Sequence, residues 1–449
     1  MAESVLVRFA GEGSGVGELS WGQREMWFRI RRRGCPLAIG AVFPLSAGAA
    51  AEDSARMLRF IMSRHPSLRT RLLIDSGGWT RQSVAAAGEI AMAVIDAGDG
   101  DPAALAEVVL HRYHDTDFDY PREWPVRMAL IRSRGVLTHL VVMYSHVAVD
   151  GGALGALVAD LATMDPVTGR SPAPLPGQDP LEQAHRQATL EGQRQSQAAL
   201  RRWERLLRSI PAGRFGGCGA EQESRYRNAM LQSPATYLAI PAIADRHGGD
   251  TSTVLLTAFA IAQARVTGIN PSVMQLMVGN RFRPGFSATV STTTQPSLCV
   301  IDTAGLTFDQ AVARARKAAF AAYKDAYYDP VQRDELIARL SRERGEDIDI
   351  ACYFNDRRNL TREMASGPVP TPADLLAALK LGRLQWLDEP MDPVSERLEV
   401  FVEDTPGTIE VRLCSDTRYL SAGHTEAIAR EMEAATVQAV LGPGYLTGA

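Results

Sequence analysis

The stretch Tyr144-Ser145-His146-Val147-Ala148-Val149-Asp150-Gly151-Gly152 carries the residues best suited to chemistry. A histidine side chain can titrate near neutral pH, so one at this position can take up or release a proton during a reaction. The Asp150-Gly151 step favours a turn, which would fix the orientation of the histidine. A single histidine at a strand end is more often structural than catalytic, so the residues alone leave both interpretations open.

The elements on either side of this stretch predict how it is positioned. Residues 138–143 form a run typical of a buried strand, and the small, leucine-spaced residues 153–161 predict a closely packed helix. Upstream, residues 128–132 and 136–143 predict a hairpin that turns at Gly135, and residues 105–114 predict a helix. The polar cluster is therefore expected at the end of a hairpin strand.

Periodicity and capping residues predict the other elements. We expect a flexible glycine-rich arm at 11–17, a helix capped by Ser20, strands at 37–45, 235–241, 272–279, 298–302 and 348–354, helices at 50–64, 180–210, 252–266, 308–328, 331–342 and 422–441, and a hairpin of 398–402 with 408–413. Thr251 or Ser252 is the expected cap of helix 252–266. Four prolines between 166 and 176 disfavour both helix and sheet interior, so a lobe boundary is expected there.

The composition is that of a globular protein and excludes several classes. Of the 449 residues, 45 % are hydrophobic and 22 % are charged, which suits two core-bearing units or one two-lobed body. The net charge of -4 gives no electrostatic footprint for nucleic acid, although the basic residues are almost all arginine, with lysine only at 317, 324 and 380. No apolar run approaches the ~20 residues that cross a bilayer. We therefore expect a cytoplasmic protein without nucleic-acid or membrane partners.

Sequence patterns for metals, disulfides and phosphate binding are missing. The cysteines at 35, 218, 299, 352 and 414 are odd in number and have no paired spacing, which favours free thiols over a disulfide framework or a zinc site. There is no Walker A or Gly-x-Ser-x-Gly pattern and no metal-ligand spacing, so no bound cofactor or metal is expected. With no carrier or adenylation pattern either, the chain is expected to be a free-standing module.

The motif resembles a known family signature. Ser145-His146-(three residues)-Asp150-Gly151 is similar to the His-His-x-x-x-Asp-Gly signature of the condensation domains of nonribosomal peptide synthetases, which belong to the chloramphenicol-acetyltransferase-like superfamily. Further similarities are Leu19-Ser20-x-x-Gln23, the block Arg64-His65-x-x-Leu68-Arg69-Thr70-Arg71, Phe118-Asp119 followed by Pro125-x-Arg127, and the partial match Thr293-Thr294-Gln295-Pro296. The resemblance spans nearly the whole chain and departs from the signature at Ser145.

The resemblance implies a fold and a division of the chain. The expected fold is α/β with mixed sheets, in which two chloramphenicol-acetyltransferase-like lobes form a V around a central tunnel. Residues 1–170 would form the N-terminal lobe with the histidine motif, and residues 171–449 the C-terminal lobe. Because such domains hold both lobes in one chain, a monomer is expected. His65 is expected to be structural, since a histidine at a helix C-terminus is favoured by the helix dipole.

The resemblance also implies roles for the motif residues. His146 would be the general base or transition-state positioner, and the Gly151 N–H would stabilise the oxyanion. Ser145 and Asp150 would be structural, and Asp150 would pair with Arg281, or with Arg283 as the second choice. The implied reaction joins an acyl or aminoacyl thioester, carried on the phosphopantetheine of a carrier protein, to an amine or hydroxyl. Two alternatives stay open at this point, a non-catalytic docking protein and an acyltransferase that uses a soluble alcohol or amine.

Overall fold

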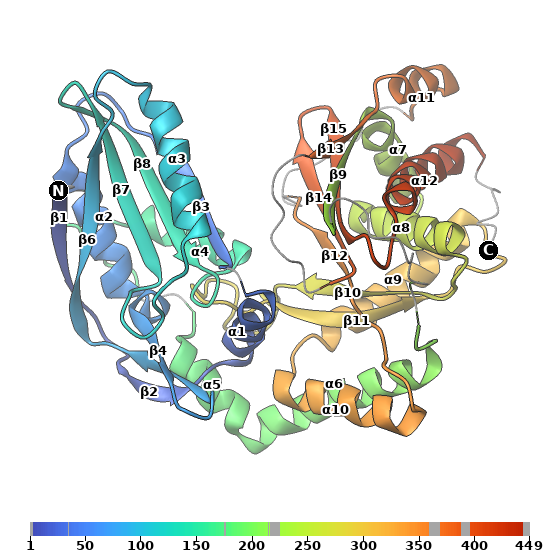
Figure 1. Ribbon diagram of the computed structural model, residues 1–449, viewed down its shortest axis with the longest axis horizontal. Helices are drawn as coiled ribbons and strands as arrows, with labels where there is room; N and C mark the ends of the chain where they lie inside the picture. Colours follow the sequence, from blue (N-terminus) through green and yellow to red (C-terminus); the bar gives the residue numbers. More distant parts are fainter. Residues whose placement is uncertain are drawn as a thin grey trace. The chain divides into compact units, whose positions relative to one another are not determined.

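The computed structural model describes residues 3–34, 36–174, 177–213, 215, 225–358, 369–387 and 396–442. The chain divides into two compact units (Figure 1). Unit 1 comprises Met1–Gln195 together with Gly279–Gln295, and unit 2 comprises Ser196–Val278 together with Pro296–Ala449. This division differs from the predicted one at 170/171, because the proline-rich stretch, the helix after it and the later segment Gly279–Gln295 all pack in unit 1.

Unit 1 is built around a five-stranded sheet of order β1-β6-β7-β8-β3 and a three-stranded sheet of order β2-β5-β4. Its elements are β1 (Glu3–Ala10), β2 (Gly15–Glu18), α1 (Trp21–Arg33), β3 (Ala38–Pro44), α2 (Ala51–Arg64), the 3-10 helix η1 (Pro66–Arg69), β4 (Thr70–Ile74), β5 (Thr80–Val84), β6 (Ala87–Asp96), α3 (Pro102–Asp115), β7 (Val126–Ser133), β8 (Val136–Ser145), α4 (Gly151–Leu161) and α5 (Pro180–Ala188). The larger sheet is mixed, since β6 and β7 are parallel and its other pairs are antiparallel.

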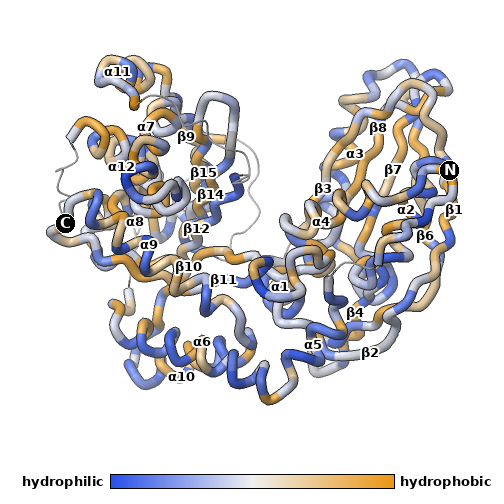
Figure 2. The backbone as a smooth tube through the Cα atoms, turned by 180° about the vertical axis from the view of Figure 1, so that it is seen from behind, coloured by the Kyte–Doolittle hydropathy of each residue, from blue (hydrophilic) through white to orange (hydrophobic). Residues whose placement is uncertain are grey.

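The alternation of side chains along β7 and β8 places helices on both faces of the larger sheet. Met128, Leu130, Leu140 and Val142 pack with residues of α2 and α4. The intervening residues Ala129, Ile131 and Val141 pack with Ala106 and Val109 of α3. Because both faces are covered, β7 and β8 are among the most apolar parts of the backbone trace (Figure 2). The predicted hairpin and the predicted helix 105–114 are confirmed.

The glycine-rich segment near the N-terminus is part of the fold, so the prediction of a flexible arm is wrong. It connects β1, which pairs along its length with β6, to β2, which pairs with β5. Gly11 N–H also donates to Ala86 O at 2.8 Å. These partners lie about 70 to 90 positions away in the sequence, which local glycine content does not reveal.

Unit 2 has a seven-stranded sheet of order β11-β10-β12-β14-β15-β9-β13. Its elements are α6 (Leu190–Ser209, beginning in the last residues of unit 1), β9 (Tyr226–Ser233), α7 (Pro234–Asp245), α8 (Thr251–Thr267), β10 (Ser272–Val278), β11 (Gln295–Ile301), α9 (Phe308–Lys324), α10 (Pro330–Arg344), β12 (Cys352–Asp356), α11 (Pro372–Leu379), β13 (Arg383–Leu387), β14 (Leu398–Thr405), β15 (Thr408–Asp416) and α12 (Ala422–Leu441). The pairs β10/β12 and β12/β14 are parallel and the pairs around β15 are antiparallel, so this sheet is mixed too. The predicted α/β class with mixed sheets is confirmed.

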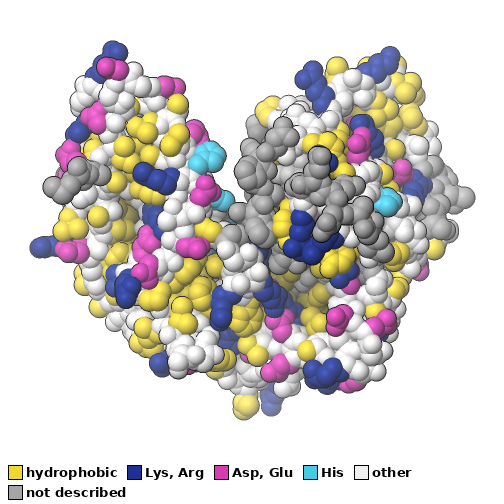
Figure 3. Space-filling view, in the orientation of Figure 1, with side chains coloured by type: hydrophobic (Ala, Val, Ile, Leu, Met, Phe, Trp, Pro, Cys, Tyr) yellow, Lys and Arg dark blue, Asp and Glu magenta, His cyan; other side chains and the backbone are white. Residues whose placement is uncertain are grey.

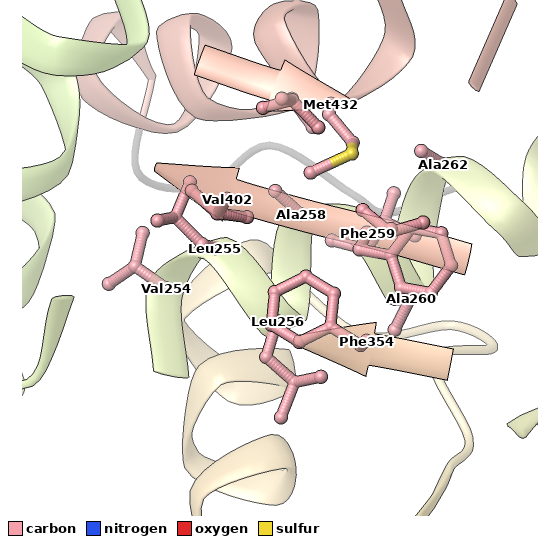
Figure 4. Close-up of a cluster of buried hydrophobic side chains, with 14 of the residues drawn as sticks. Val254, Leu255, Leu256, Ala258, Phe259, Ala260, Ala262, Phe354, Val402 and Met432 are labelled. Atoms are coloured by element: carbon pink, nitrogen blue, oxygen red, sulfur yellow. The ribbon is translucent and has the colours of Figure 1, made fainter. Parts of the chain in front are cut away.

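The main core of unit 2 surrounds α8, which is apolar on all sides. Its residues Leu255, Phe259 and Ala262 pack among side chains of the sheet and of α12, including Phe354, Val402 and Met432 (Figure 4). A helix that is apolar all round must be buried, and every residue from Thr253 to Ala264 is buried. On the other face of β10 and β11, α6 and α10 enclose a second cluster around Trp203, Tyr328 and Leu340.

Three sequence predictions are corrected in this region. Residues 235–241, predicted as a strand, belong to α7, because Ser233 caps the helix and Pro234 occupies its first position. The cap of α8 is Asp250, whose side chain accepts from the N–H groups of Ser252 and Thr253. The single helix predicted at 180–210 is two helices, α5 and α6, separated at Thr189. The helix at 422–441 and the hairpin of β14 and β15 are confirmed.

The proline-rich connection is held against unit 1 by arginine side chains. Arg64 donates to Ala173 O and Pro174 O at 3.2 Å each, and Arg56 donates to Pro166 O at 2.6 Å. The prolines of this connection disfavour helix and sheet, and the carbonyl groups named here accept from arginine side chains instead. Of the cysteines, Cys299, Cys352 and Cys414 are buried and are not in disulfides, whereas the predictions for Cys35 and Cys218 fall outside the described residues.

Candidate active site

The loop 146–150, between β8 and α4, is folded around Ser145. The Ser145 carbonyl accepts from Ala148 N at 3.0 Å and from Val149 N at 3.2 Å. Its hydroxyl accepts from Val147 N at 3.4 Å, a local side-chain-to-backbone bond typical of serine in turns. Ser145 is fully buried, and its own N–H donates to Pro125 O at 3.0 Å. Ser145, the residue that departs from the family signature, thus binds the loop backbone through both its carbonyl and its hydroxyl.

His146 is half-buried and its ring is oriented by the loop itself. Nδ1 lies 3.0 Å from Val149 O. Because a carbonyl oxygen can only accept, this contact requires a proton on Nδ1, so in the neutral ring the lone pair is on Nε2. The backbone is fixed as well, since His146 N donates to Leu37 O at 2.9 Å and His146 O accepts from the Thr292 hydroxyl. The ring therefore has the tautomer that a general base needs.

Asp150 is buried, and both oxygens of its carboxylate accept hydrogen bonds from several donors. Oδ1 accepts from Ala153 N at 2.8 Å, which makes Asp150 the N-cap of α4, and from Arg281 Nη2 at 2.6 Å. Oδ2 accepts from the N–H groups of Thr293 at 2.9 Å and Thr294 at 3.1 Å, and from the Thr294 hydroxyl at 2.9 Å. Burial favours a raised pKa, but the Arg281 charge and these hydrogen bonds outweigh it and hold the pKa of Asp150 below its usual value. A carboxylate bound in this way serves structure and not proton transfer.

Arg281 is the arginine that pairs with Asp150. Its Nη1 also donates to Thr289 O at 2.7 Å and its Nη2 to Ser291 O at 3.2 Å. Arg283, the second choice from the sequence, instead donates from Nε to Asn280 Oδ1 at 2.9 Å. Arg281 follows unit 2 strands in sequence, yet it belongs to unit 1 because the whole segment Gly279–Gln295 packs there. We call Gly279–Gln295 the crossing segment.

Gly151 and Gly152 form the first turn of α4 in different surroundings. A Cβ at position 152 would lie 2.1 Å from Arg281 Nε, so the arginine can reach Asp150 only past a glycine. A Cβ at position 151 would meet nothing within 4 Å, and Gly151 is exposed. The first N–H groups of a helix have no partner within the helix, and its N-terminus carries partial positive charge. Gly151 is exposed and is the first residue of the helix, so its N–H is suited to a developing negative charge.

The crossing segment is supported by residues of two other sequence blocks. A Cβ at Gly22, at the start of α1, would lie 2.2 Å from Thr292 O, so α1 packs directly on this carbonyl. Ser67 donates from its hydroxyl to Val290 O at 2.6 Å. The N-terminus of α1 is fixed by the predicted cap Ser20, which forms a capping box with Gln23. These contacts explain why motifs distant in sequence serve one loop.

The other end of α4 is held by Arg64, His65 and Asp160. Arg64 binds both carboxylate oxygens of Asp160, at 2.8 and 2.7 Å, and His65 Nε2 lies 3.0 Å from Oδ2. Burial would raise the pKa of Asp160, but the bonds from His65 and Arg64 hold it to about 2. Burial lowers the pKa of His65 and outweighs the attraction of Asp160. His65 is structural, as predicted, and α4 is anchored at both ends by a carboxylate.

The site residues that sequence reasoning missed are Thr292, Thr293, Thr294 and Asp160. The threonines were visible only as a partial family match, and a run of threonines has no signature of its own. Thr292 acts through its hydroxyl, whereas Thr293 and Thr294 act partly through backbone N–H groups, which every residue but proline has. Among the described residues, no cluster of His, Cys, Asp and Glu could hold a metal ion, and no helix is long and apolar enough to span a bilayer.

On the face of unit 1 seen in Figure 3, basic and acidic side chains are interspersed. The hydrogen-bonded carboxylates described above are buried within unit 1.

Comparisons with known proteins point to one protein family. A protein-family model described as "Condensation domain" matches residues 37–351. A probable non-canonical nonribosomal peptide synthetase, CymA, of Salinispora arenicola is 32% identical over 167 residues, which are 36% of this chain. The cyclosporin synthetase simA of Tolypocladium inflatum is 26% identical over 392 residues, or 82% of this chain. The chain spans only 2% of the length of each of these two relatives.

A solved structure has the same fold at low sequence identity. The complex of the X-domain and OxyB from teicoplanin biosynthesis contains a chain that matches 98% of this chain, over 96% of its own length. The TM-score is 0.72 and the sequence identity 17%. At that identity the likeness concerns the fold.

Proposed function

Because this chain belongs to the condensation-domain family, we propose that it joins a carrier-bound acyl or aminoacyl thioester to an amine or hydroxyl acceptor in nonribosomal peptide or polyketide biosynthesis. The observation that carries the proposal is the contact of His146 Nδ1 with Val149 O, which puts the ring lone pair on Nε2. A general base must be unprotonated at the nitrogen that meets the substrate, and this loop imposes that tautomer.

The proposed step is attack of the acceptor nitrogen or oxygen on the thioester carbonyl. His146 Nε2 takes the proton of the acceptor as the new C–N or C–O bond forms. The tetrahedral oxyanion is stabilised by the Gly151 N–H at the N-terminus of α4. The C–S bond then breaks, and the proton returns from His146 to the phosphopantetheine thiolate. The products are an amide or ester and the free thiol of a carrier protein.

The structure also bears on Ser145, the departure from the family signature. Ser145 is fully buried, and its hydroxyl accepts from the loop backbone at Val147. A side chain in that position supports the loop and does not meet substrate. Its replacement of a histidine therefore leaves the proton-transfer role of His146 intact in this proposal.

A second function is favoured by the structural comparison. The X-domain of similar fold was solved in complex with OxyB, so a domain of this fold can bind another protein. The rival proposal for this chain is recruitment of a partner protein without chemistry. The two proposals differ in whether any acyl group leaves a loaded carrier.

Single-turnover mass spectrometry separates the proposals. A carrier protein loaded with an acyl or aminoacyl group is mixed with the chain and with one of three acceptors: a second loaded carrier, a free amine or a free alcohol. Condensation predicts that the donor carrier loses its acyl mass and that the chosen acceptor gains it, with His146→Ala as the inactive control. Transfer to the free acceptors alone would indicate a soluble-acceptor acyltransferase. Stable binding of a carrier or tailoring enzyme with no transfer to any acceptor would refute the proposed chemistry.

A further inference from the structure

The peptide group between His146 and Val147 is held at both ends by side-chain hydroxyls. Its carbonyl oxygen accepts from the Thr292 hydroxyl, and its N–H donates to Ser145 Oγ at 3.4 Å. A peptide group is planar, so it turns as one body, and a turn of this one would break both bonds. Because the group directly follows the Cα atom of His146, its plane sets ψ of that residue. The direction in which the His146 side chain leaves the loop therefore depends on two hydroxyls.

The contact that orients the imidazole ring spans the same peptide group. His146 Nδ1 lies 3.0 Å from Val149 O, three residues further along the loop. The backbone between the ring and this carbonyl runs through the peptide group that the hydroxyls hold, so a turn of that group moves the ring relative to its acceptor. The acceptor residue is itself fixed, since Val149 N donates to Ser145 O at 3.2 Å. The two hydroxyls thus act on the contact that requires the proton on Nδ1.

The two hydroxyls belong to well-anchored parts of unit 1. Ser145 is the last residue of β8, and Thr292 lies in the crossing segment; both are fully buried. The carbonyl of Thr292 packs against α1, where a Cβ at Gly22 would lie 2.2 Å from its oxygen. The next residue is bound as well, through Thr293 N to Asp150 Oδ2 at 2.9 Å. Hydroxyls on such supports restrain the loop and do not move with it.

The two positions require a hydroxyl for opposite reasons. Ser145 uses its oxygen to accept from an N–H, whereas Thr292 uses its O–H to donate to a carbonyl. A hydroxyl can do either, but an aliphatic side chain can do neither, and a buried N–H or carbonyl left without a partner is costly. For these bonds serine and threonine are equivalent, whereas alanine and valine are not.

We propose that Ser145 and Thr292 are positioning residues for His146, which together clamp the peptide group that follows it and hold the ring against Val149 O. The clamp gives Ser145 a defined role at the position where the chain departs from the family signature. It also extends the support of the site to the crossing segment and, through the close contact at Gly22, to the N-terminus of α1. The effect on catalysis rests on the proposed function, whereas the clamp itself does not.

Amide hydrogen exchange on the full-length chain tests the clamp without any substrate. Thr292→Val, which replaces the hydroxyl with a methyl group, should speed exchange in a peptide covering 146–150 about tenfold, the factor for one net hydrogen bond. The matched control is Thr138→Val, the same substitution near the other end of β8, where the Thr138 hydroxyl donates to Ile131 O at 3.2 Å. The control should leave exchange in the loop peptide unchanged. Equal exchange in the two variants would overturn the clamp.

A double variant tests whether the two hydroxyls act on one peptide group. Ser145→Ala should speed exchange in the same peptide, and its combination with Thr292→Val should exceed the larger single effect by less than about twofold, because releasing either end already frees the group. Single effects that multiply would show independent action and contradict the clamp. If Ser145→Ala does not fold, the comparison of Thr292→Val with Thr292→Ser decides alone. The serine variant should then exchange as the unmodified chain does, and the valine variant faster.

A kinetic readout separates positioning from mere stability. With a loaded carrier as probe, Thr292→Val should lower the single-turnover rate roughly ten- to a hundredfold while the half-saturating carrier concentration stays unchanged. Thr292→Ser should retain most of the rate that the valine variant loses, and Thr138→Val should retain all of it. A Thr292→Val rate equal to that of the control would remove the positioning role. If the unmodified chain transfers no acyl group, the proposed function fails, but hydrogen exchange still decides the clamp.

Discussion

Replacing Asp150 with asparagine isolates the contribution of the Asp150–Arg281 pair. Asparagine caps a helix as well as aspartate does, so the cap of α4 is kept. The substitution removes the negative charge that compensates Arg281 and turns an amide group toward the N–H donors of Thr293 and Thr294. Asp150 is only 2% exposed, and breaking a buried pair by changing one partner costs about 3–5 kcal/mol. We therefore expect the free energy of unfolding of unit 1 to fall by about that amount.

The assay is urea unfolding at neutral pH, followed by a probe in unit 1. The fluorescence of Trp27, which contacts Tyr120 beside the loop, is suitable when the other tryptophans of the chain are replaced with phenylalanine. The matched control is Asp101→Asn in α3, where Asp101 also caps a helix through Ala103 N, at 2.9 Å, but lies exposed. This control should change the free energy of unfolding by less than about 0.5 kcal/mol. Equal small losses in the two variants would refute the view that the buried charge pair holds the loop.

Three further predictions concern the two glycines at the start of α4, the stability of unit 1 in acid and a buried glutamate in unit 2. Gly152→Ala should destabilise unit 1 strongly because its Cβ would lie 2.1 Å from Arg281 Nε, whereas Gly151→Ala should fold normally, and comparing their thermal midpoints checks this. The Arg64–His65–Asp160 cluster should add about 2 kcal/mol to the free energy of unfolding above pH 4. This contribution should be lost as the pH falls through the Asp160 pKa of about 2. Asp160→Asn should therefore make stability depend less on pH between these two values. Burial raises the pKa of Glu433 in α12, although Ser233 donates to its carboxylate at 2.5 Å. The folded state therefore holds the Glu433 proton more tightly than the unfolded state does. Stability is then lost as the pH rises past the ordinary pKa of a glutamate. Glu433→Gln should therefore leave stability at pH 8 unchanged or higher, and a lower midpoint at that pH would contradict this reasoning.

Local patterns in the sequence were sufficient where a structure depends on near neighbours. The hairpin at Gly135, the cap at Ser20 and the helix at 422–441 follow from turn residues, capping residues and periodicity. The Asp150–Arg281 contact was reached from the family resemblance, since 131 positions separate the two residues and nothing local links them. The candidate role of His146 as a general base was likewise inferred from the family resemblance, because no local sequence pattern distinguishes a catalytic histidine at a strand end from a structural one.

What the sequence did not reveal depends on long-range pairing and on the backbone. The strand β1 precedes a glycine-rich stretch and acquires its structure from β6, so it was missed. In α7 the proline at its first position and the serine cap outweigh a composition that also suits a strand. Thr293 and Thr294 act partly through main-chain N–H groups, which carry no residue-specific signal.

The crossing segment has a consequence for the order in which the protein is made. Unit 1 receives Arg281 and the threonines that bind Asp150 only after most of the first 295 residues have left the ribosome, including the early elements of unit 2. Until then the carboxylate that begins α4 has neither its arginine nor its threonine partners. The nascent N-terminal part is therefore expected to remain incomplete at the His146 loop during synthesis. A gene fragment that ends at residue 195 would lack the same partners permanently, so separate expression of the two halves is a poor route to an active protein.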